Sequence, residues 1–179
     1  MGGENAMIEV VFSAAAIAER LDALVKDIRA AGQQQLVVVP ILKGSFMFAA
    51  DLIRAMHAAG LAPEIDFLSL ASYGEAEQSS GAVRIVRDIE SDVRGRDVLL
   101  VDDILESGRT LAFAKSYLSE RGARRVLTCV LLNKPVPRAA PIAADYVAFV
   151  CPNEFVVGYG MDLAHRYREL PFVGRLVRR

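Results

Sequence analysis

The chain has 179 residues, with 21 lysines and arginines against 22 aspartates and glutamates. This length predicts a single domain with a core that needs no disulfide or structural metal. The balanced charge argues against nucleic acid as a partner, and no apolar stretch approaches the ~18 residues needed to span a membrane. Cys129 and Cys151 lie in apolar runs without a C-x-x-C spacing, so we expect buried, reduced thiols and a cytoplasmic protein.

In chain order, hydrophobic periodicity predicts helices at residues 13–31, 46–59 and 110–121. In the second helix, the inward residues should be Phe46, Ala49, Leu52, Ile53 and Met56. Strands are expected at residues 36–42, 64–71, 83–86, 98–101, 126–132 and 146–150. Because strands alternate with helices, we expect an α/β fold with a mostly parallel central sheet and helices on both faces. The core should cover residues 33–150, and residues 1–12 and 151–179 should form a small hood.

The most informative segment runs Val-Leu-Leu-Val-Asp-Asp-Ile-Leu-Glu-Ser-Gly-Arg-Thr-Leu over residues 98–111. It predicts a buried strand, a glycine-containing turn and the start of a helix. The backbone N–H groups of such a turn, at the positive end of a helix dipole, suit a phosphate. Asp102 and Asp103 suit a sugar diol or a hydrated Mg²⁺. The alternative is that the two carboxylates merely solvate the turn.

This segment resembles the ribose-5-phosphate motif of the type I phosphoribosyltransferases, which use 5-phosphoribosyl-1-pyrophosphate (PRPP). The resemblance implies that Asp102 and Asp103 face the ribose hydroxyls and Mg²⁺. It also assigns the 5′-phosphate to a run of five residues: Glu106, Ser107, Gly108, Arg109 and Thr110.

Two further segments fit the same resemblance. Leu42-Lys43-Gly44 lies between a strand and a helix, where glycine lets the backbone approach a ligand and lysine can meet an anion. It matches the pyrophosphate loop of purine phosphoribosyltransferases, which often contains a cis peptide. Ser72-Tyr73 opens the polar segment 72–81 and matches the start of their closing loop. Taken alone, each would be an ordinary turn or a solvated connection.

The C-terminal half resembles the purine-binding region of hypoxanthine (hypoxanthine-guanine) phosphoribosyltransferases, above all in Phe155-Val156-Val157-Gly158-Tyr159. By this resemblance Phe155 and Val156 hold the flat base, and Asp162 binds both the base region and a second Mg²⁺. Arg168 would bind pyrophosphate, because a guanidinium forks onto phosphate oxygens. Lys134 would donate to the six-position oxygen, which favours a 6-oxopurine over adenine because lysine only donates.

The resemblance therefore implies an enzyme of the type I phosphoribosyltransferase fold. It would transfer the phosphoribosyl group from PRPP to N9 of hypoxanthine, and also of guanine. The products would be IMP or GMP and pyrophosphate, with Mg²⁺ as cofactor. A homodimer or homotetramer is also implied.

One residue departs from the family pattern. The general base is usually an aspartate, whereas this chain has Glu106, whose carboxylate is displaced by one methylene, about 1.5 Å. Three alternatives follow from this and from the shared motifs. They are a catalytically silent PRPP sensor, an RNA-binding regulator on the same fold, and a xanthine-guanine or adenine phosphoribosyltransferase.

Overall fold

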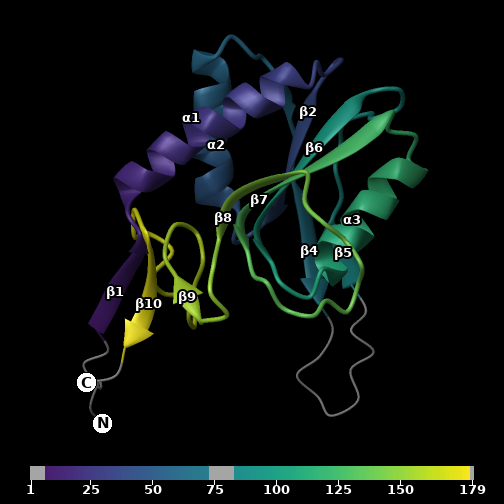
Figure 1. The fold of residues 1–179 in the computed structure, drawn as a ribbon. Coiled ribbons are helices and arrows are strands. Elements are labelled where there is room, and N and C mark those ends of the chain that lie inside the picture. The colour runs from purple at the N-terminus through teal and green to yellow at the C-terminus, as the bar shows by residue number, and fades with distance from the viewer. Residues whose placement is uncertain (1–6, 73–82, 178–179) are drawn as a thin grey trace.

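The computed structural model describes residues 7–72 and 83–177. Its main sheet has the strand order β5-β4-β2-β6-β7-β8, with β3 beside β2 (Figure 1). The strands are β2 (Val37–Leu42), β3 (Glu64–Ile65), β4 (Leu68–Ser72), β5 (Val83–Arg87), β6 (Asp97–Leu105), β7 (Arg125–Asn133) and β8 (Tyr146–Val150). Only the edge strand β5 is antiparallel to its neighbour, so the prediction of a mostly parallel sheet is confirmed.

Helices cover both faces of this sheet, as predicted (Figure 1). The helices α1 (Ala14–Ala30) and α2 (Phe46–Ala58) share one hydrophobic core with Leu99 and Val101 of β6. The helix α3 (Arg109–Glu120) shares the other core with Val98 and Leu100 of the same strand. Successive strand residues point to opposite faces, so the continuous apolar run of β6 fills both cores.

The helix boundaries follow their capping residues. The Ser13 hydroxyl accepts a hydrogen bond from the Ala16 N–H at 3.2 Å, which caps α1 as predicted. The inward face of α2 differs at one position: Phe46 is 40% exposed, whereas Phe48 is fully buried. At 100° per residue Phe46 lies roughly 100° from the centre of the buried stripe, so the prediction for Phe46 was wrong.

The strand predicted at residues 64–71 is two strands. Between β3 and β4 the Asp66 carboxylate accepts hydrogen bonds from the backbone N–H groups of Glu90 and Ser91, both at 2.7 Å. It also accepts from the N–H of Phe67 at 2.7 Å. These contacts with a distant segment interrupt the strand, and the local apolar pattern does not reveal them.

A second, smaller sheet lies at one end of the main sheet (Figure 1). Its strands are β1 (Met7–Phe12), β10 (Val173–Val177) and β9 (Val156–Val157), in that order and antiparallel. It therefore joins residues from both ends of the chain into the hood that the fold class implied. No helix in the two described ranges is long and apolar enough to cross a bilayer.

Candidate active site

The candidate site lies at the carboxyl ends of β2, β6 and β7. From β2 the chain continues toward β4 on one side, whereas from β6 it continues to β7 and β8 on the other. In open α/β sheets the crevice at such a reversal is the usual ligand site. The segments that follow these three strands carry Lys43-Gly44, Glu106–Thr110 and Lys134, so the topology brings together residues far apart in sequence.

Two carboxylates form the floor of the site. Asp102 and Asp103 lie within β6, which extends further than the predicted strand and ends at Leu105. The Asp103 carboxylate packs against the Gly44 backbone: a methyl group at Gly44 would place its carbon 1.7 Å from Asp103 Oδ2. Glycine at position 44 is therefore needed for this close approach of the turn after β2 to the strand β6.

Burial perturbs both carboxylates. Asp102 is only 7% exposed, and burial together with the adjacent Asp103 charge raises its pKa well above the usual range. Burial also raises the pKa of Asp103, while the positive charge of Arg168 acts in the opposite direction. Two acids that resist ionisation favour a cation between them, because the cation offsets their mutual repulsion.

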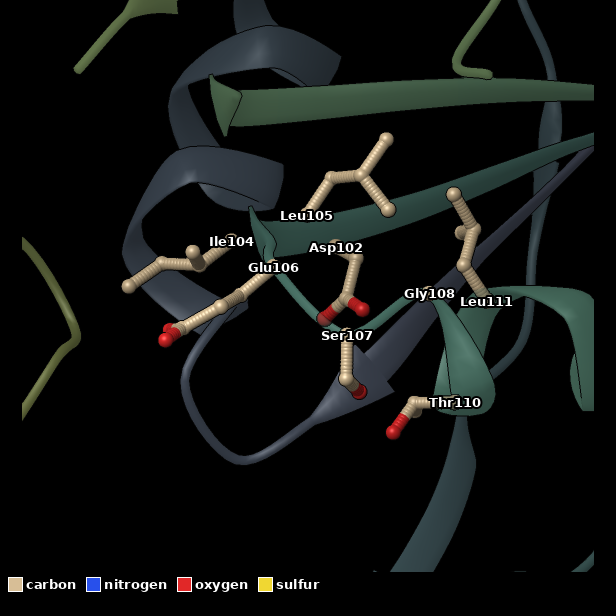
Figure 2. A pocket seen from close by; sticks show the side chains of 8 residues that line it. All are labelled: Asp102, Ile104, Leu105, Glu106, Ser107, Gly108, Thr110 and Leu111. Atoms are coloured by element: carbon tan, nitrogen blue, oxygen red, sulfur yellow. The ribbon is translucent and has the colours of Figure 1, made fainter. Parts of the chain in front are cut away.

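The turn after β6 forms the start of α3. Gly108 has a left-handed backbone (φ +77°) and caps the helix, which begins at Arg109, one residue before the predicted start. The first N–H groups of a helix have no partner within it. Figure 2 shows the Ser107 and Thr110 hydroxyls turned to the same side of this loop, with the Asp102 carboxylate pointing toward them. Together these donors suit an anion with several oxygens.

Two adjoining cavities open at this loop. One, of about 100 Å³, is lined by residues of the turn and by Asp102 (Figure 2). The other, of about 230 Å³, reaches the Leu42-Lys43-Gly44 segment and Asp103. Both share Asp102, Ile104 and Thr110, so the turn after β6, the two acids and the segment after β2 line neighbouring cavities.

The segment after β2 contacts the C-terminal part of the chain. The Leu42–Lys43 peptide bond is cis, as the family resemblance implied. A methyl group at Gly160 would place its carbon 2.2 Å from the carbonyl oxygen of Gly44. The turn around Gly160 thus lies directly on the Lys43-Gly44 loop, and this contact was not visible in the sequence.

The candidate base and the candidate purine ligand form an ion pair. Lys134 Nζ lies 3.1 Å from Glu106 Oε2. The lysine side chain is only 7% exposed, against 52% for the glutamate, so Lys134 is not an ordinary surface lysine. Its backbone N–H donates to the Leu105 carbonyl at 3.0 Å, which ties it to the end of β6. In Figure 2 the Glu106 side chain points away from the Ser107 and Thr110 hydroxyls.

The remaining predicted residues lie on the hood side of the site. Phe155 is 57% exposed, whereas Val156 is buried in β9. Arg168 pairs with Asp162 at 2.7 Å and donates to the Gly160 carbonyl at 2.6 Å. The Asp162 carboxylate also accepts from the His165 N–H at 2.8 Å, so both charged residues are held in this arrangement.

The predicted closing loop lies mostly outside the described residues. Ser72 is the last residue of β4, and Tyr73 is not described. Within residues 7–72 and 83–177, no cluster of three or more His, Cys, Asp or Glu side chains is arranged to hold a metal. Asp102 and Asp103 nevertheless fit Mg²⁺, which usually binds through one or two carboxylates and keeps several waters.

Sequence reasoning missed two side chains that hold the site together. The Tyr159 hydroxyl donates to Asp51 on α2 at 2.7 Å. Arg138 donates to Asn133 and to the Ile142 carbonyl. Arg138 is the only charged residue in the proline-rich segment 135–144, and this isolation in the sequence could have indicated a structural role.

Comparisons with known proteins agree on one family. Residues 9–163 match the phosphoribosyl transferase domain. The hypoxanthine phosphoribosyltransferase of Salmonella typhimurium is 43% identical over 80% of this chain and 79% of its own length. The hypoxanthine-guanine phosphoribosyltransferase of Mycobacterium avium is 43% identical over 84% and 73%. The crystal structure of a hypoxanthine phosphoribosyltransferase from Staphylococcus aureus, at 39% identity, superposes with a TM-score of 0.87 and covers 94% of this chain and 91% of that one.

Proposed function

The chain belongs to the hypoxanthine phosphoribosyltransferases of the phosphoribosyl transferase domain family, and we propose that it joins a free 6-oxopurine to PRPP. The acceptor would be hypoxanthine, and also guanine, and the products would be IMP or GMP and pyrophosphate. The observation that carries this proposal is the turn between β6 and α3, an anion cradle directly beside the buried Asp102 carboxylate and the half-buried Asp103 carboxylate.

The cradle would anchor PRPP through its 5′-phosphate. The residues proposed for this role are Glu106, Ser107, Gly108, Arg109 and Thr110, whose backbone and hydroxyl groups surround the first turn of α3. Binding energy gained at this remote phosphate would fix the ribose carbon that reacts. The ribose hydroxyls would face Asp102 and Asp103.

The same two carboxylates would hold Mg²⁺, with Asp162 proposed as ligand of a second ion. When bound, Mg²⁺ supplies positive charge that stabilises the departing pyrophosphate. Arg168 and the Leu42-Lys43-Gly44 backbone would bind the same leaving group. Ser72 and Tyr73 would belong to a closing segment that excludes water from the ribosyl cation.

The purine would enter between the hood and the end of β7. Phe155 would stack on its ring, Val156 would pack beside it, and Lys134 would donate to its 6-oxo group. The purine loses its N7 proton as N9 attacks, and Glu106 is the proposed acceptor of that proton. Glu106 and Lys134 contact each other at 3.1 Å in the structure. When a purine binds, Lys134 would turn to its 6-oxo group and Glu106 to its N7 proton.

We further propose a cytoplasmic protein that assembles as a homodimer or homotetramer. The two free cysteines, both buried, support a reducing compartment. Assembly is implied by the family resemblance alone. Light scattering on the purified chain would give the oligomeric state directly.

The decisive experiment supplies PRPP and Mg²⁺ with hypoxanthine, guanine, xanthine or adenine in turn, and measures pyrophosphate release. We expect release with hypoxanthine and guanine. Release with xanthine or adenine instead would reassign the substrate. If PRPP binds in calorimetry but no base supports release, the chain is a silent sensor, an alternative favoured by the engagement of Glu106 with Lys134.

A further inference from the structure

The connection between β7 and β8 packs against the cradle. The Ala140 N–H donates to the Ser107 carbonyl at 3.1 Å. A methyl group at Gly108 would place its carbon 2.7 Å from the Ala140 carbonyl oxygen and 2.9 Å from Cγ2 of Ile142. The backbone of the connection therefore lies in direct contact with the two central residues of the turn, Ser107 and Gly108.

One side chain fixes the course of this connection. The Arg138 guanidinium donates through Nη1 to the Ile142 carbonyl at 2.6 Å and through Nη2 to Asn133 Oδ1. Asn133 is the last residue of β7, so the two acceptors lie at opposite ends of the connection, and Ala140 lies between them. Arg138 thus closes the connection into a loop whose middle meets the cradle.

The burial of this guanidinium is costly. Its Nε atom is buried and has no hydrogen-bond partner among the described residues. An unpaired buried donor on a charged group lowers stability. The two hydrogen bonds of the same guanidinium offset this cost only while the connection keeps its present backbone course, so the geometry ties Arg138 to that course.

We propose that Arg138 is a positioning residue for the 5′-phosphate cradle. It acts through Ala140, whose backbone fixes the Ser107 carbonyl and the space around Gly108. This inference rests on the proposed function, because it takes PRPP as the ligand of the turn. Arg138 does not itself touch PRPP; without it, the connection moves and the phosphate donors lose their alignment.

The consequence is specific to one substrate. Misalignment of the cradle weakens the interaction with PRPP, while Lys134 keeps its own backbone hydrogen bond to Leu105. Arg138→Ala should therefore raise the dissociation constant and the KM for PRPP by about tenfold or more. The KM for the purine should change by less than about twofold, since the purine contacts do not pass through Ala140.

Arg20 offers a matched control. From α1 it donates to the carbonyls of Ala148 and Val147, both at 2.8 Å, on the edge strand β8 that follows the connection. Like Arg138, it is half-buried and donates from two nitrogens, although both of its acceptors are backbone carbonyls. Arg20→Ala should cost thermal stability comparable to Arg138→Ala and leave PRPP affinity within about twofold.

The test compares wild type, Arg138→Ala, Arg138→Lys and Arg20→Ala. Calorimetry with PRPP and Mg²⁺, KM values for both substrates and thermal unfolding are measured for each. Lysine can reach only one acceptor, so Arg138→Lys should give an intermediate PRPP affinity, and it still decides the question if the alanine variant does not fold. The inference is overturned if the dissociation constants for PRPP of the Arg138 variants are the same as that of Arg20→Ala. Failure of wild type to bind PRPP would instead overturn the proposed function.

Discussion

At the scale of single residues, Glu106 differs from the aspartate that usually stands at this position in the family. The longer side chain reaches Lys134 at 3.1 Å, although 28 residues separate the two in sequence. The pair neutralises a lysine that is almost completely buried, and burial of an unpaired ammonium would be unfavourable. Glu106 therefore has a structural reason to be acidic in addition to its proposed role as base.

Substitution of Glu106 separates these two roles. Glu106→Gln keeps the shape but cannot accept a proton, so we expect turnover to fall by about 100-fold or more. Glu106→Asp restores the usual family residue and should keep turnover within about tenfold of wild type. Steady-state rates of pyrophosphate release provide the measurement. Near-normal turnover in Glu106→Gln would show that the residue only belongs to the phosphate turn.

At the scale of elements, one aromatic residue joins the hood side of the site to the helix α2, in addition to the stacking of Phe12 of β1 on Phe149 of β8. Tyr159 is 4% exposed, and its hydroxyl donates to Asp51 of α2 at 2.7 Å. Burial, together with the neighbouring Asp51 charge, raises the pKa of Tyr159, so the hydroxyl stays protonated and remains a donor. The helix that follows the Lys43-Gly44 loop is thereby tied to the turn that covers that loop.

Tyr159→Phe tests this attachment. Loss of one hydrogen bond to a charged acceptor should lower the free energy of unfolding by about 1.5–3 kcal/mol. Asp51 keeps its ion pair with Arg54, which favours the lower end of that range. The melting temperature should fall by a few degrees, and denaturant unfolding gives the free energy. An unchanged free energy would mean that the hydroxyl adds nothing to the attachment of the hood.

At the scale of the whole molecule, the site lowers the stability of the fold that carries it. Asp102 is a strand residue placed in the interior beside a second acid, and its pKa is raised. A carboxyl group whose pKa is higher in the folded than in the unfolded protein destabilises the fold at every pH at which the group is ionised in the unfolded protein. This penalty is absent below the ordinary aspartate pKa of about 3.9 and grows as pH rises toward the folded value.

Asp102→Asn removes the penalty. We expect a higher melting temperature at neutral pH, by about 2–4 °C for each kcal/mol recovered. The difference from wild type should shrink as pH falls toward 4, because the wild-type carboxyl then becomes increasingly protonated in the unfolded protein as well. Activity should fall sharply, since the proposed ribose and Mg²⁺ contacts are lost. Calorimetric scans from pH 4 to 8 check the trend, and a difference that widens on acidification contradicts it.

Local pattern was enough to predict most of the main sheet and its helices. The strand at β6 and the α1 stripe are periodic over many residues, and Ser13 and Gly32 mark the ends of that helix. The acidic pair and the glycine turn also followed from sequence, because strand, turn and helix are consecutive. The roles assigned to these residues remain predictions.

Long-range contacts account for what the sequence did not reveal. The break at Asp66 depends on the N–H groups of Glu90 and Ser91, and the hood depends on pairing between the first and last described strands. The contact of Gly160 with Gly44 and the hydrogen bonds of Arg138 to Ile142 and Asn133 also join segments that no local periodicity relates. Such contacts decide the fine geometry of the site. The family pattern therefore indicated the candidate site residues, but not Arg138 and Tyr159, which hold the neighbouring segments in place.

The pairing of β1 with β10 has a consequence for synthesis on the ribosome. β1 emerges first among the described strands, yet its partner emerges last. At about 5–20 residues per second, β1 waits on the order of ten seconds as an unpaired, partly apolar edge. The turn between β6 and α3 can already form in that interval, whereas the sheet of β1, β10 and β9 is still incomplete.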